Sequence, residues 1–453
     1  MSSTSGSERH APKPLRIAVV GGGPAGALFA CFAFFFARQV ERPIDVTIYE
    51  PRDFSRGARP GCNMCAGLIP THVLDEMAEI GIFLPPRVIR NRISDYSLHV
   101  SAGRLDVAQP DKKASVVSVF RGNGPLQPPP KLPISLDAFL LSEAVARGAQ
   151  LRPLPVRSIN LGRNTPCLRT AGDQTEPYDL IVLAAGVNGP PLPVEGILHR
   201  PPATRSMAQT EVRLPPAAIK TLRGRVHIFL PSEGNLMFGT LVPKENYVNI
   251  SLFGDDLPRG SMTSFLSLPE VKAQLGVRPN RICGCLPRIA VSAADPLYGN
   301  GFVAIGDSGV TRLYKNGIGS ALRTARSSAR TALFFGPSAA AFRRGYEPVC
   351  RDIIQDNRYG HLLFLATHIF QNCPRLTHPH LMTVKWEQRQ PPRRRRLSRL
   401  IWGMFTGSDS YRALFTLALD PRIQYHLLHC LIADTWYGRD LHTAMMSKGR
   451  LEL

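Results

Sequence analysis

The sequence predicts an α/β protein with an inserted antiparallel sheet and a mostly helical C-terminal region. Three observations carry this prediction. An apolar, β-branched run ends in a glycine-rich turn and leads into a stretch of helical period, residues 205–255 alternate as several strands, and residues 346–453 are patterned mainly as helices. At 453 residues, with 44% hydrophobic residues, the chain is long enough for two or three domains with sizeable cores.

The first elements predict a Rossmann-like, dinucleotide-binding unit over about residues 15–60. A strand ending at Val20 precedes Gly-x-Gly-x-x-Gly, a helix follows over 27–37, and a second strand over 46–49 ends at an acid. The first glycine allows a tight turn, the second lets the backbone approach a pyrophosphate, and the third lets helix and strand pack closely. The helix N-terminus favours phosphate, and the acid suits a ribose. The predicted contacts are Gly21, Gly23, Pro24, Ala25, Gly26 and Glu50. A glycine-rich turn in another α/β protein is the alternative.

The elements that follow alternate between helices and strands. We expect helices over 72–80, 137–147 and 317–335, and a proline-rich connection over 122–133. Two further buried strands end in small residues or an acid, at Gly186 and at Gly306-Asp307. The predicted organisation is a disordered tail (1–14), a first part of the nucleotide-binding domain (15–190, with strands at about 90–120 joining the substrate sheet), an antiparallel substrate-binding sheet (191–295), a second part of the nucleotide-binding domain (296–345) and a helical region (346–453).

The charge balance indicates an anionic partner. The formal net charge is +21, which favours membrane lipid, nucleic acid or an acidic substrate. Residues 1–14 do not resemble a signal peptide, and no run reaches the ~18–20 apolar residues of a membrane span. We therefore expect a cytoplasmic protein with mostly reduced thiols. Peripheral contact with the inner membrane face is an open alternative.

One arginine run gives this charge a location. Arg393, Arg394, Arg395 and Arg396 directly precede an apolar, aromatic segment that contains Trp402. Arginines next to anionic headgroups and aromatic residues at the interface would suit a peripheral membrane contact. A solvated helix face is the bland alternative. Nucleic acid is a weaker one, because no zinc finger, helix-turn-helix or RNA-binding signature accompanies the run.

Four features in this order resemble the FAD-dependent oxidoreductases of the aromatic-hydroxylase fold: the turn at 21–26, the strand ending at Gly186, the strand ending at Asp307, and the turn at 316–319. Within that group the chain is most similar to the geranylgeranyl reductase family. Three stretches carry the closer resemblance: Cys-Ala-Gly-Leu at 65–68, Phe-Gly-Thr-Leu-Val-Pro-Lys at 238–244 with the following Val-Asn strand, and Trp-Gly-Met-Phe-Thr-Gly at 402–407 with Tyr-Arg at 411–412.

The resemblance implies FAD and assigns contacts to it. Gly306 would approach the pyrophosphate and Asp307 the ribityl chain, although Asp307 could instead cap a helix. The helix N-terminus formed by Gly317, Ile318 and Gly319 would face the flavin pyrimidine edge and stabilise its reduced, anionic form. Gly186 belongs to the same site. The family carries an arginine just before its Phe-Asp-x-x-Leu helix, and Arg121 would take that role here.

The loop after Asp307 departs from the family. It carries Arg312, Tyr314 and Lys315, where relatives have mostly small, apolar residues, and Asn316 stands where an acid is common. These departures indicate a substrate that is anionic or otherwise unlike a plain isoprenoid.

The implied activity is reduction of carbon–carbon double bonds in a lipophilic, isoprenoid-like substrate, by hydride transfer from reduced flavin N5. A proton would come from solvent, Cys65 or Tyr314. The sequence shows no separate NAD(P)H domain, so NADPH or another external donor stays open. A flavin monooxygenase of the same fold is the first alternative. A non-enzymatic escort or electron-transfer protein is the second.

The paired cysteines allow several interpretations. Cys62 and Cys65 form Cys-x-x-Cys, and Cys283 and Cys285 form Cys-x-Cys. Cys62 and Cys65 could be a redox dithiol, all four could bind zinc, or they could be structural. No metal site is predicted. Cys65 is the best single candidate for catalysis, because it matches the family's cysteine beside the flavin, with Cys62 as its partner.

Overall fold

The computed structural model describes residues 13–54, 65–110, 114–122, 134–162, 165–172, 175–232, 235–277, 279–281 and 283–437. Nearly all of the predicted tail, Cys62 and most of the proline-rich connection lie outside these residues.

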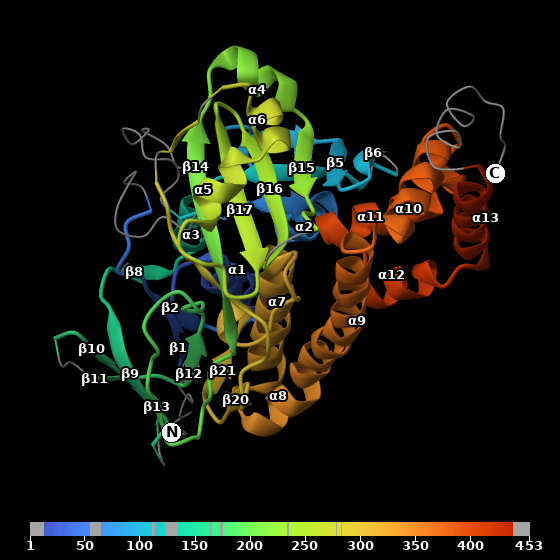
Figure 1. The fold of residues 1–453 in the computed structure, drawn as a ribbon. Helices are drawn as coiled ribbons and strands as arrows, with labels where there is room; N and C mark the ends of the chain where they lie inside the picture. Colours follow the sequence, from blue (N-terminus) through green and yellow to red (C-terminus); the bar gives the residue numbers. More distant parts are fainter. Residues whose placement is uncertain are drawn as a thin grey trace, which may run out of the picture.

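A six-stranded sheet forms the nucleotide-type domain (Figure 1). Its order is β20-β21-β12-β1-β2-β8, and all neighbours are parallel except β20 and β21. The strands are β1 (Leu15–Val20), β2 (Ile44–Tyr49), β8 (Gln150–Arg152), β12 (Leu180–Leu183), β20 (Tyr298–Gly299) and β21 (Phe302–Ala304). The central strands are apolar on both faces, as expected for a parallel sheet that is covered on both sides.

Three helices cover one face of this sheet: α1 (Pro24–Gln39), α3 (Leu136–Ala146) and α7 (Gly317–Phe335). Helix α1 is apolar on nearly every side because it lies between β1, α3 and α7. A small sheet packs on the opposite face. It consists of β9 (Val156–Asn160), β10 (Cys167–Thr170), β11 (Thr175–Pro177) and β13 (Val194–Glu195).

A large, mainly antiparallel sheet forms the second part of the fold. Its order is β18-β14-β17-β16-β15-β5-β6, with β19 also pairing with β14. The strands are β5 (Asp95–Val100), β6 (Gly103–Ala108), β14 (Thr204–Arg213), β15 (Arg225–Phe229), β16 (Leu236–Lys244), β17 (Tyr247–Gly254), β18 (Asn280–Arg281) and β19 (Arg288–Ala290). Helices α4 (Pro216–Leu222), α5 (Ser261–Ser267) and α6 (Pro269–Leu275) cover one face.

The strands expected between 90 and 120 divide between two sheets. β5 and β6 join the large sheet through β15. In contrast, β4 (Ile89–Ile93) and β7 (Val116–Val119) pair with β3 (Leu68–Pro70), just before α2 (Thr71–Ala78). This three-stranded sheet lies between the two larger ones. Its strands β7 and β4 contact β16 of the large sheet, and Ile69, Val117 and Val119 belong to the hydrophobic core around α1.

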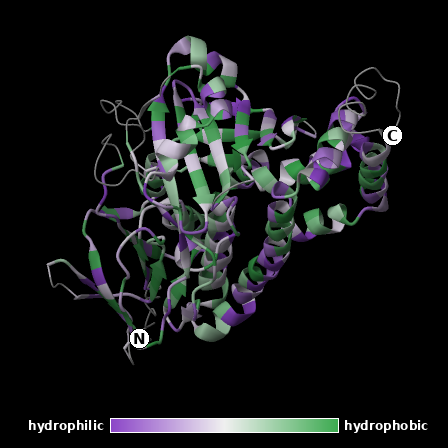
Figure 2. Cartoon of the chain, viewed as in Figure 1, coloured by the Kyte–Doolittle hydropathy of each residue, from purple (hydrophilic) through white to green (hydrophobic). Residues whose placement is uncertain are grey.

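The C-terminal region is helical and packs on the free face of the large sheet. Its helices are α8 (Ala339–Gly345), α9 (Glu347–Gln371), α10 (Pro374–Glu387), α11 (Arg396–Thr406), α12 (Tyr411–Ala418) and α13 (Pro421–Tyr437). Among the described residues, no helix has the length and apolar character needed to cross a membrane. Figure 2 shows hydrophobic residues along the sheet strands and along α13.

The aromatic segment after the arginine run does not lie at the surface, which corrects one basis of the membrane prediction. Trp402, Met404 and Phe405 are at most 5% exposed, because α11 presents them to the large sheet. The Trp402 indole N–H donates to the Ala114 carbonyl at 3.1 Å, and its ring packs edge-on against Tyr96. A membrane surface cannot reach these side chains in this fold.

Candidate functional site

The glycine turn connects β1 to α1 at the carboxyl edge of the parallel sheet. Gly21 has φ +108°, and a Cβ there would lie 2.5 Å from the Ala184 carbonyl oxygen. A Cβ on Gly26 would overlap the Gly21 carbonyl. Gly23 differs, because the nearest atom to a Cβ there is Asp137 Oδ1, at 4.0 Å. The turn thus requires glycine at its two ends and leaves space at Gly23, where a phosphate could approach the backbone.

Glu50 is buried behind this turn and already accepts several hydrogen bonds. Its Oε2 accepts from the Gly22 N–H at 2.9 Å, and Oε1 accepts from the Arg52 N–H at 3.0 Å. The Arg52 guanidinium bonds both carboxylate oxygens, at 2.9 and 3.0 Å. A ribose hydroxyl could therefore reach this carboxylate only if Arg52 moved. Arg52 was not predicted as a site residue, although its position two residues after the acid is a usable signal.

Arg121 lies at the start of α3 although it precedes that helix by fifteen residues. A backbone bridge joins Phe120 to Ser135, and the Leu136 N–H donates to the Phe120 carbonyl at 2.9 Å. The Arg121 Nε then bonds Asp137 Oδ2 at 2.7 Å. The structure thus places Arg121 where an arginine directly before the helix would stand.

Asp137, Cys65 and Asp307 interact electrostatically with Arg121. Burial acts to lower its pKa, but Asp137, Cys65 and Asp307 outweigh this effect and raise it. Asp137 Oδ1 is also the described atom nearest to a Cβ placed on Gly23. The Arg121–Asp137 ion pair therefore lies between the glycine turn and the segments of Cys65 and Asp307.

Gly306 and Asp307 follow β21 and meet the first helix. Gly306 has φ +56°, and a Cβ there would lie 2.7 Å from the Ala25 Cβ, so a side chain would push α1 away. The neighbouring Ser308 hydroxyl accepts from the Gly186 N–H at 2.7 Å. This hydrogen bond joins the ends of β12 and β21.

Asp307 does not cap α7, since Asn316 performs that function. Burial raises the Asp307 pKa, whereas Thr311 and Arg121 lower it.

The first turn of α7 differs in one respect from the prediction. Asn316 has φ +55°, and its Oδ1 accepts from the Gly319 N–H at 3.0 Å. The Gly319 N–H is thus used within the helix cap rather than facing a ligand. Gly317 is exposed, and a Cβ there would lie 3.8 Å from Asp307 Oδ1. Gly317 and Asp307 therefore lie next to each other. Ile318 follows in the same helical turn.

The predicted catalytic side chains lie in different surroundings. Cys65 is half-buried, and its Sγ accepts from the Gly67 N–H at 3.4 Å. Cys62 is outside the described residues. The Tyr314 ring packs 4.4 Å from Phe253 and 5.0 Å from Phe364, centre to centre, and burial raises its pKa. Tyr314 is therefore part of an aromatic cluster between the large sheet and α9.

Cys283 and Cys285 lie beside β14. Cys283 Sγ accepts from the Glu211 N–H at 3.3 Å, and burial raises the pKa of Cys285 to about 11. Glu211 pairs with Lys244, whose ammonium donates to the Cys65 carbonyl at 2.7 Å. No group of three potential metal ligands occurs in the part of the chain that the structure describes. Lys244 lies in a recognised motif, but its connection to Cys65 could not be read from the sequence.

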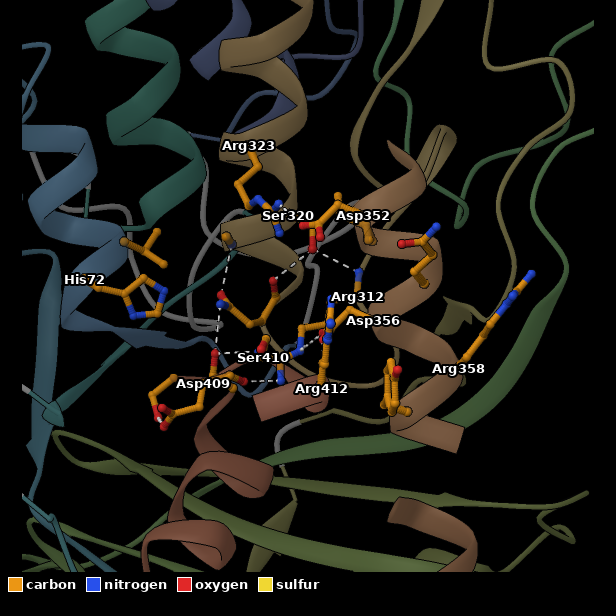
Figure 3. Close-up of a pocket in the computed structure, with 18 of the residues that line it drawn as sticks. His72, Arg312, Ser320, Arg323, Asp352, Asp356, Arg358, Asp409, Ser410 and Arg412 are labelled. Atoms are coloured by element: carbon orange, nitrogen blue, oxygen red, sulfur yellow. Dashed lines mark hydrogen bonds and ion pairs between the residues drawn. The ribbon is translucent and has the colours of Figure 1, made fainter. Parts of the chain in front are cut away.

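A cavity of about 430 Å³ lies behind the first turn of α7 (Figure 3). Its lining includes charges of both signs, among them Arg312, Arg323, Asp352 and Asp356. Many of these side chains bond one another or the loop carbonyls. Arg312, for example, bonds the Gly407 carbonyl at 2.8 Å and the Asp409 carbonyl. The Arg312 hydrogen bonds anchor the loop of residues 308–316 to the loop of residues 407–409.

Comparisons with solved structures show the fold. A geranylgeranyl bacteriochlorophyll reductase-like protein from Thermoplasma acidophilum is 14% identical, with a TM-score of 0.59 over 92% of this chain and 100% of that chain. A flavoprotein/dehydrogenase from Cytophaga hutchinsonii is 14% identical, with a TM-score of 0.57 over 97% and 100%. The flavin-dependent halogenase CmlS is 16% identical, with a TM-score of 0.57 over 98% and 74%. No protein-family model and no curated protein matches the sequence.

The predicted fold class is therefore confirmed: this is the α/β fold of FAD-binding flavoproteins, with a helical C-terminal region. At these identities the similarity concerns the fold alone. The narrower resemblance to the geranylgeranyl reductase family stays a hypothesis.

Proposed function

We propose that this protein is an FAD-dependent oxidoreductase that reduces carbon–carbon double bonds of a lipophilic, isoprenoid-like substrate. One observation carries the proposal. The glycine turn, the Arg121–Asp137 pair, Asp307 and the first turn of α7 converge at the carboxyl ends of β1, β12 and β21. This edge of a parallel sheet is where such folds bind dinucleotides.

The residues present fit FAD. The backbone is accessible at Gly23, and among the described residues no atom lies within 4 Å of a Cβ placed on Gly186. Asp307 offers a carboxylate next to the exposed Gly317. When bound, FAD would supply the hydride equivalent for the double bond, with NADPH or another external donor reducing it.

The chain's own groups would bind and orient the reactants. Asp307 would accept hydrogen bonds from the ribityl hydroxyls, and the N-terminus of α7 would favour negative charge beside Gly317 and Ile318. Cys65 is near enough to Arg121 for the two side chains to interact electrostatically. Lys244 holds the Cys65 backbone in place. These contacts make Cys65 the first candidate to move a proton at its Sγ atom.

A monooxygenase is the second candidate. Similarity to the halogenase CmlS covers 98% of this chain, and the polar loop of residues 308–316 is unusual for a plain isoprenoid reductase. Oxygen uptake coupled to NADPH oxidation would favour this function.

The purified protein should show flavin absorbance or take up added FAD. The reduced protein, incubated anaerobically with lipid extract, should yield a product heavier by two hydrogens. Gly23→Val is the matched control, because a Cβ at this position meets no atom of the described chain closer than 4.0 Å. This variant should fold as the wild type does but lose FAD. A wild-type protein without any FAD affinity would overturn the proposal.

A further inference from the structure

A groove of about 760 Å³ lies between α11, α12 and the first turn of α13. In Figure 1 these helices are at the right of the view, away from the parallel sheet. The groove is lined by residues between 396 and 422, whereas the candidate cofactor site is built from residues before 320. Its volume is within the range of roughly 300–1,000 Å³ that is usual for small-molecule sites. The groove is therefore a separate cavity of useful size.

One part of the lining is apolar. Leu414 and Leu417 of α12 and Leu419 of the following turn line the groove, together with Ala413 and Pro421. Leu414 is 1% exposed, Leu417 is half-buried and Leu419 is 62% exposed. An apolar chain placed here would remove the exposed leucine surface from water, which is favourable.

The other part of the lining is cationic. Arg396 Nη1 bonds Asp420 at 2.7 Å, and Arg399 Nη2 bonds Asp409 at 3.2 Å. These bonds hold α11 against the segments at both ends of α12, and they leave other N–H groups of each guanidinium unused, since arginine has five donors. Arg422 is exposed, and its side chain has no hydrogen-bond or ion-pair partner in the part of the chain that the structure describes. Three arginines thus face two aspartates, and the lining has a net positive charge.

The groove continues into the exposed apolar side of α13. Pro421 and Arg422 are the first two residues of this helix. Tyr425 follows Arg422 by three residues and Leu428 by six, so all three lie on neighbouring parts of the helix surface. Tyr425 and Leu428 are 61% and 57% exposed. A soluble anion would gain nothing from this apolar surface, whereas a lipid within a bilayer would contact it.

We propose that this groove binds one anionic phospholipid of a membrane. The lipid phosphate would accept hydrogen bonds from Arg422 and from the unused N–H groups of Arg396 and Arg399. The acyl chains would lie against Leu417 and Leu419. The guanidinium fork matches the oxygens of a phosphate, and a zwitterionic lipid would add a repelled ammonium to the same place. The site requires neither FAD nor the proposed function.

Calorimetric titration of the full chain with three soluble probes tests the proposal. The probes are dihexanoyl phosphatidylglycerol and dihexanoyl phosphatidylcholine, both kept monomeric, and glycerol 3-phosphate. Phosphatidylcholine supplies the acyl chains without net charge, and glycerol 3-phosphate supplies the charge without acyl chains. The wild type should bind phosphatidylglycerol at a single saturable site, roughly tenfold or more tightly than either of the other two.

Variants at exposed positions identify the two parts of the site. Arg422→Gln should weaken the binding of phosphatidylglycerol roughly fivefold and leave that of phosphatidylcholine nearly unchanged. Leu419→Gln should weaken the binding of both lipids. The matched controls are Arg412→Gln, on α12 but outside the groove, and Leu365→Gln, on α9. Both should bind as the wild type does.

A wild type that does not bind phosphatidylglycerol, or binds it no better than phosphatidylcholine, would overturn the proposal. Equally tight binding of glycerol 3-phosphate would overturn it too, because the site would then take a soluble anion. The same holds for an unchanged affinity in Arg422→Gln, or for an equal loss in Arg412→Gln. Leu428→Gln with Trp436→Gln, farther along α13, should leave the titration unchanged. A loss in this variant would place the lipid on α13 and not in the groove.

Discussion

Lys244 and Glu211 form a buried ion pair that supports the Cys65 segment. Their side chains are 1% and 5% exposed, and the charged atoms lie 3.3 Å apart. The Lys244 ammonium also donates to the Cys65 carbonyl at 2.7 Å and lies over the Phe120 ring. Removing one partner leaves the other charge buried without compensation.

Lys244→Met should lower the free energy of unfolding by about 3–5 kcal/mol, as for other broken buried pairs. Urea unfolding, followed by circular dichroism, measures this. Arg205→Met breaks the exposed pair with Asp255 and should lower it by at most ~1 kcal/mol. Equal losses in the two variants would show that Lys244 and Glu211 are no more coupled than a surface pair.

Substitutions at Glu50 and Arg52 test whether the Glu50 carboxylate contacts the FAD ribose directly. If Glu50 binds ribose, Glu50→Ala should weaken FAD binding by about tenfold, the scale of a lost hydrogen bond to a charged group. Arg52→Gln frees the carboxylate oxygens and should leave FAD affinity unchanged or higher. Flavin fluorescence during FAD titration gives both values. A larger loss in Arg52→Gln than in Glu50→Ala would show that the arginine contacts FAD and the acid only positions it.

The residues predicted best are those whose role depends on local backbone. Gly21 and Gly26 stand out in the sequence because a strand–turn–helix excludes a Cβ at both positions. The partners of Lys244 could not be predicted, since Glu211 and Cys65 are 33 and 179 residues away in the chain. The hydrogen-bond partner of a single N–H group could not be predicted either. The Gly319 N–H, for example, donates to the Asn316 side chain.

At the scale of elements, the loop of residues 308–316 depends on contacts from α9 and α12. Asn357 makes two hydrogen bonds to its backbone, and the Tyr411 hydroxyl bonds the Leu313 carbonyl. The ends of the helix after this loop were predictable from its amphipathic pattern and flanking glycine. The loop's path was not, because its partners come from helices that begin 31 residues or more after the loop ends.

Asn357→Ala should lower the free energy of unfolding by about 2 kcal/mol, since it removes two hydrogen bonds of roughly 1 kcal/mol each. Hydrogen exchange should increase locally over 311–316. Gln355→Ala, at an exposed position of the same helix, should change neither. Exchange that increases over the whole chain, or not at all, would mean that Asn357 does not anchor the loop.

A histidine pair between β5 and β15 gives the large sheet a pH dependence. His99 Nε2 and His227 Nδ1 lie 3.0 Å apart. Burial lowers the pKa of His99 to about 4 and that of His227 to about 3. Both are neutral in the folded protein, whereas the unfolded chain binds protons below its ordinary pKa near 6.5. Stability should therefore fall as pH decreases from about 6.5 towards 4.

His227→Gln should flatten this dependence, by at most ~1.4 kcal/mol per pH unit for each histidine that no longer titrates on unfolding. Urea unfolding at pH 7 and pH 5 measures the slope in wild type and variant, and carboxylates contribute equally to both. His361→Gln, on α9 outside the pair, is the control. Identical slopes in wild type and His227→Gln would mean that the pair is not neutral in the folded state.

At the scale of the whole molecule, the net charge of +21 and the C-terminal helices favour an anionic surface as partner. Of the four consecutive arginines, Arg395 and Arg396 bond the Gln390 carbonyl and Asp420. Arg393 and Arg394 are exposed and have no side-chain partner within the described residues. The C-terminal helices also carry an exposed apolar surface on α13, where side chains spaced three and four apart are at least half exposed: Tyr425, Leu428, Ile432 and Trp436. That α11 is buried and α13 is exposed could not be predicted from the sequence, because burial of α11 depends on its packing against the sheet.

We therefore propose that α13 and the two free arginines contact anionic membranes. Co-sedimentation with vesicles of phosphatidylglycerol and phosphatidylcholine should weaken as salt rises, because ions screen headgroup attraction. Arg393→Glu with Arg394→Glu should weaken binding by roughly tenfold or more, at about 1 kcal/mol for each arginine removed. Leu428→Gln with Trp436→Gln should weaken it independently of salt, since it removes apolar insertion without adding charge. Phe83→Gln changes a similarly exposed apolar side chain outside this surface and should have no effect. If the arginine and α13 variants bind as the wild type does while salt still releases the protein, the overall positive charge suffices and α13 has no membrane role.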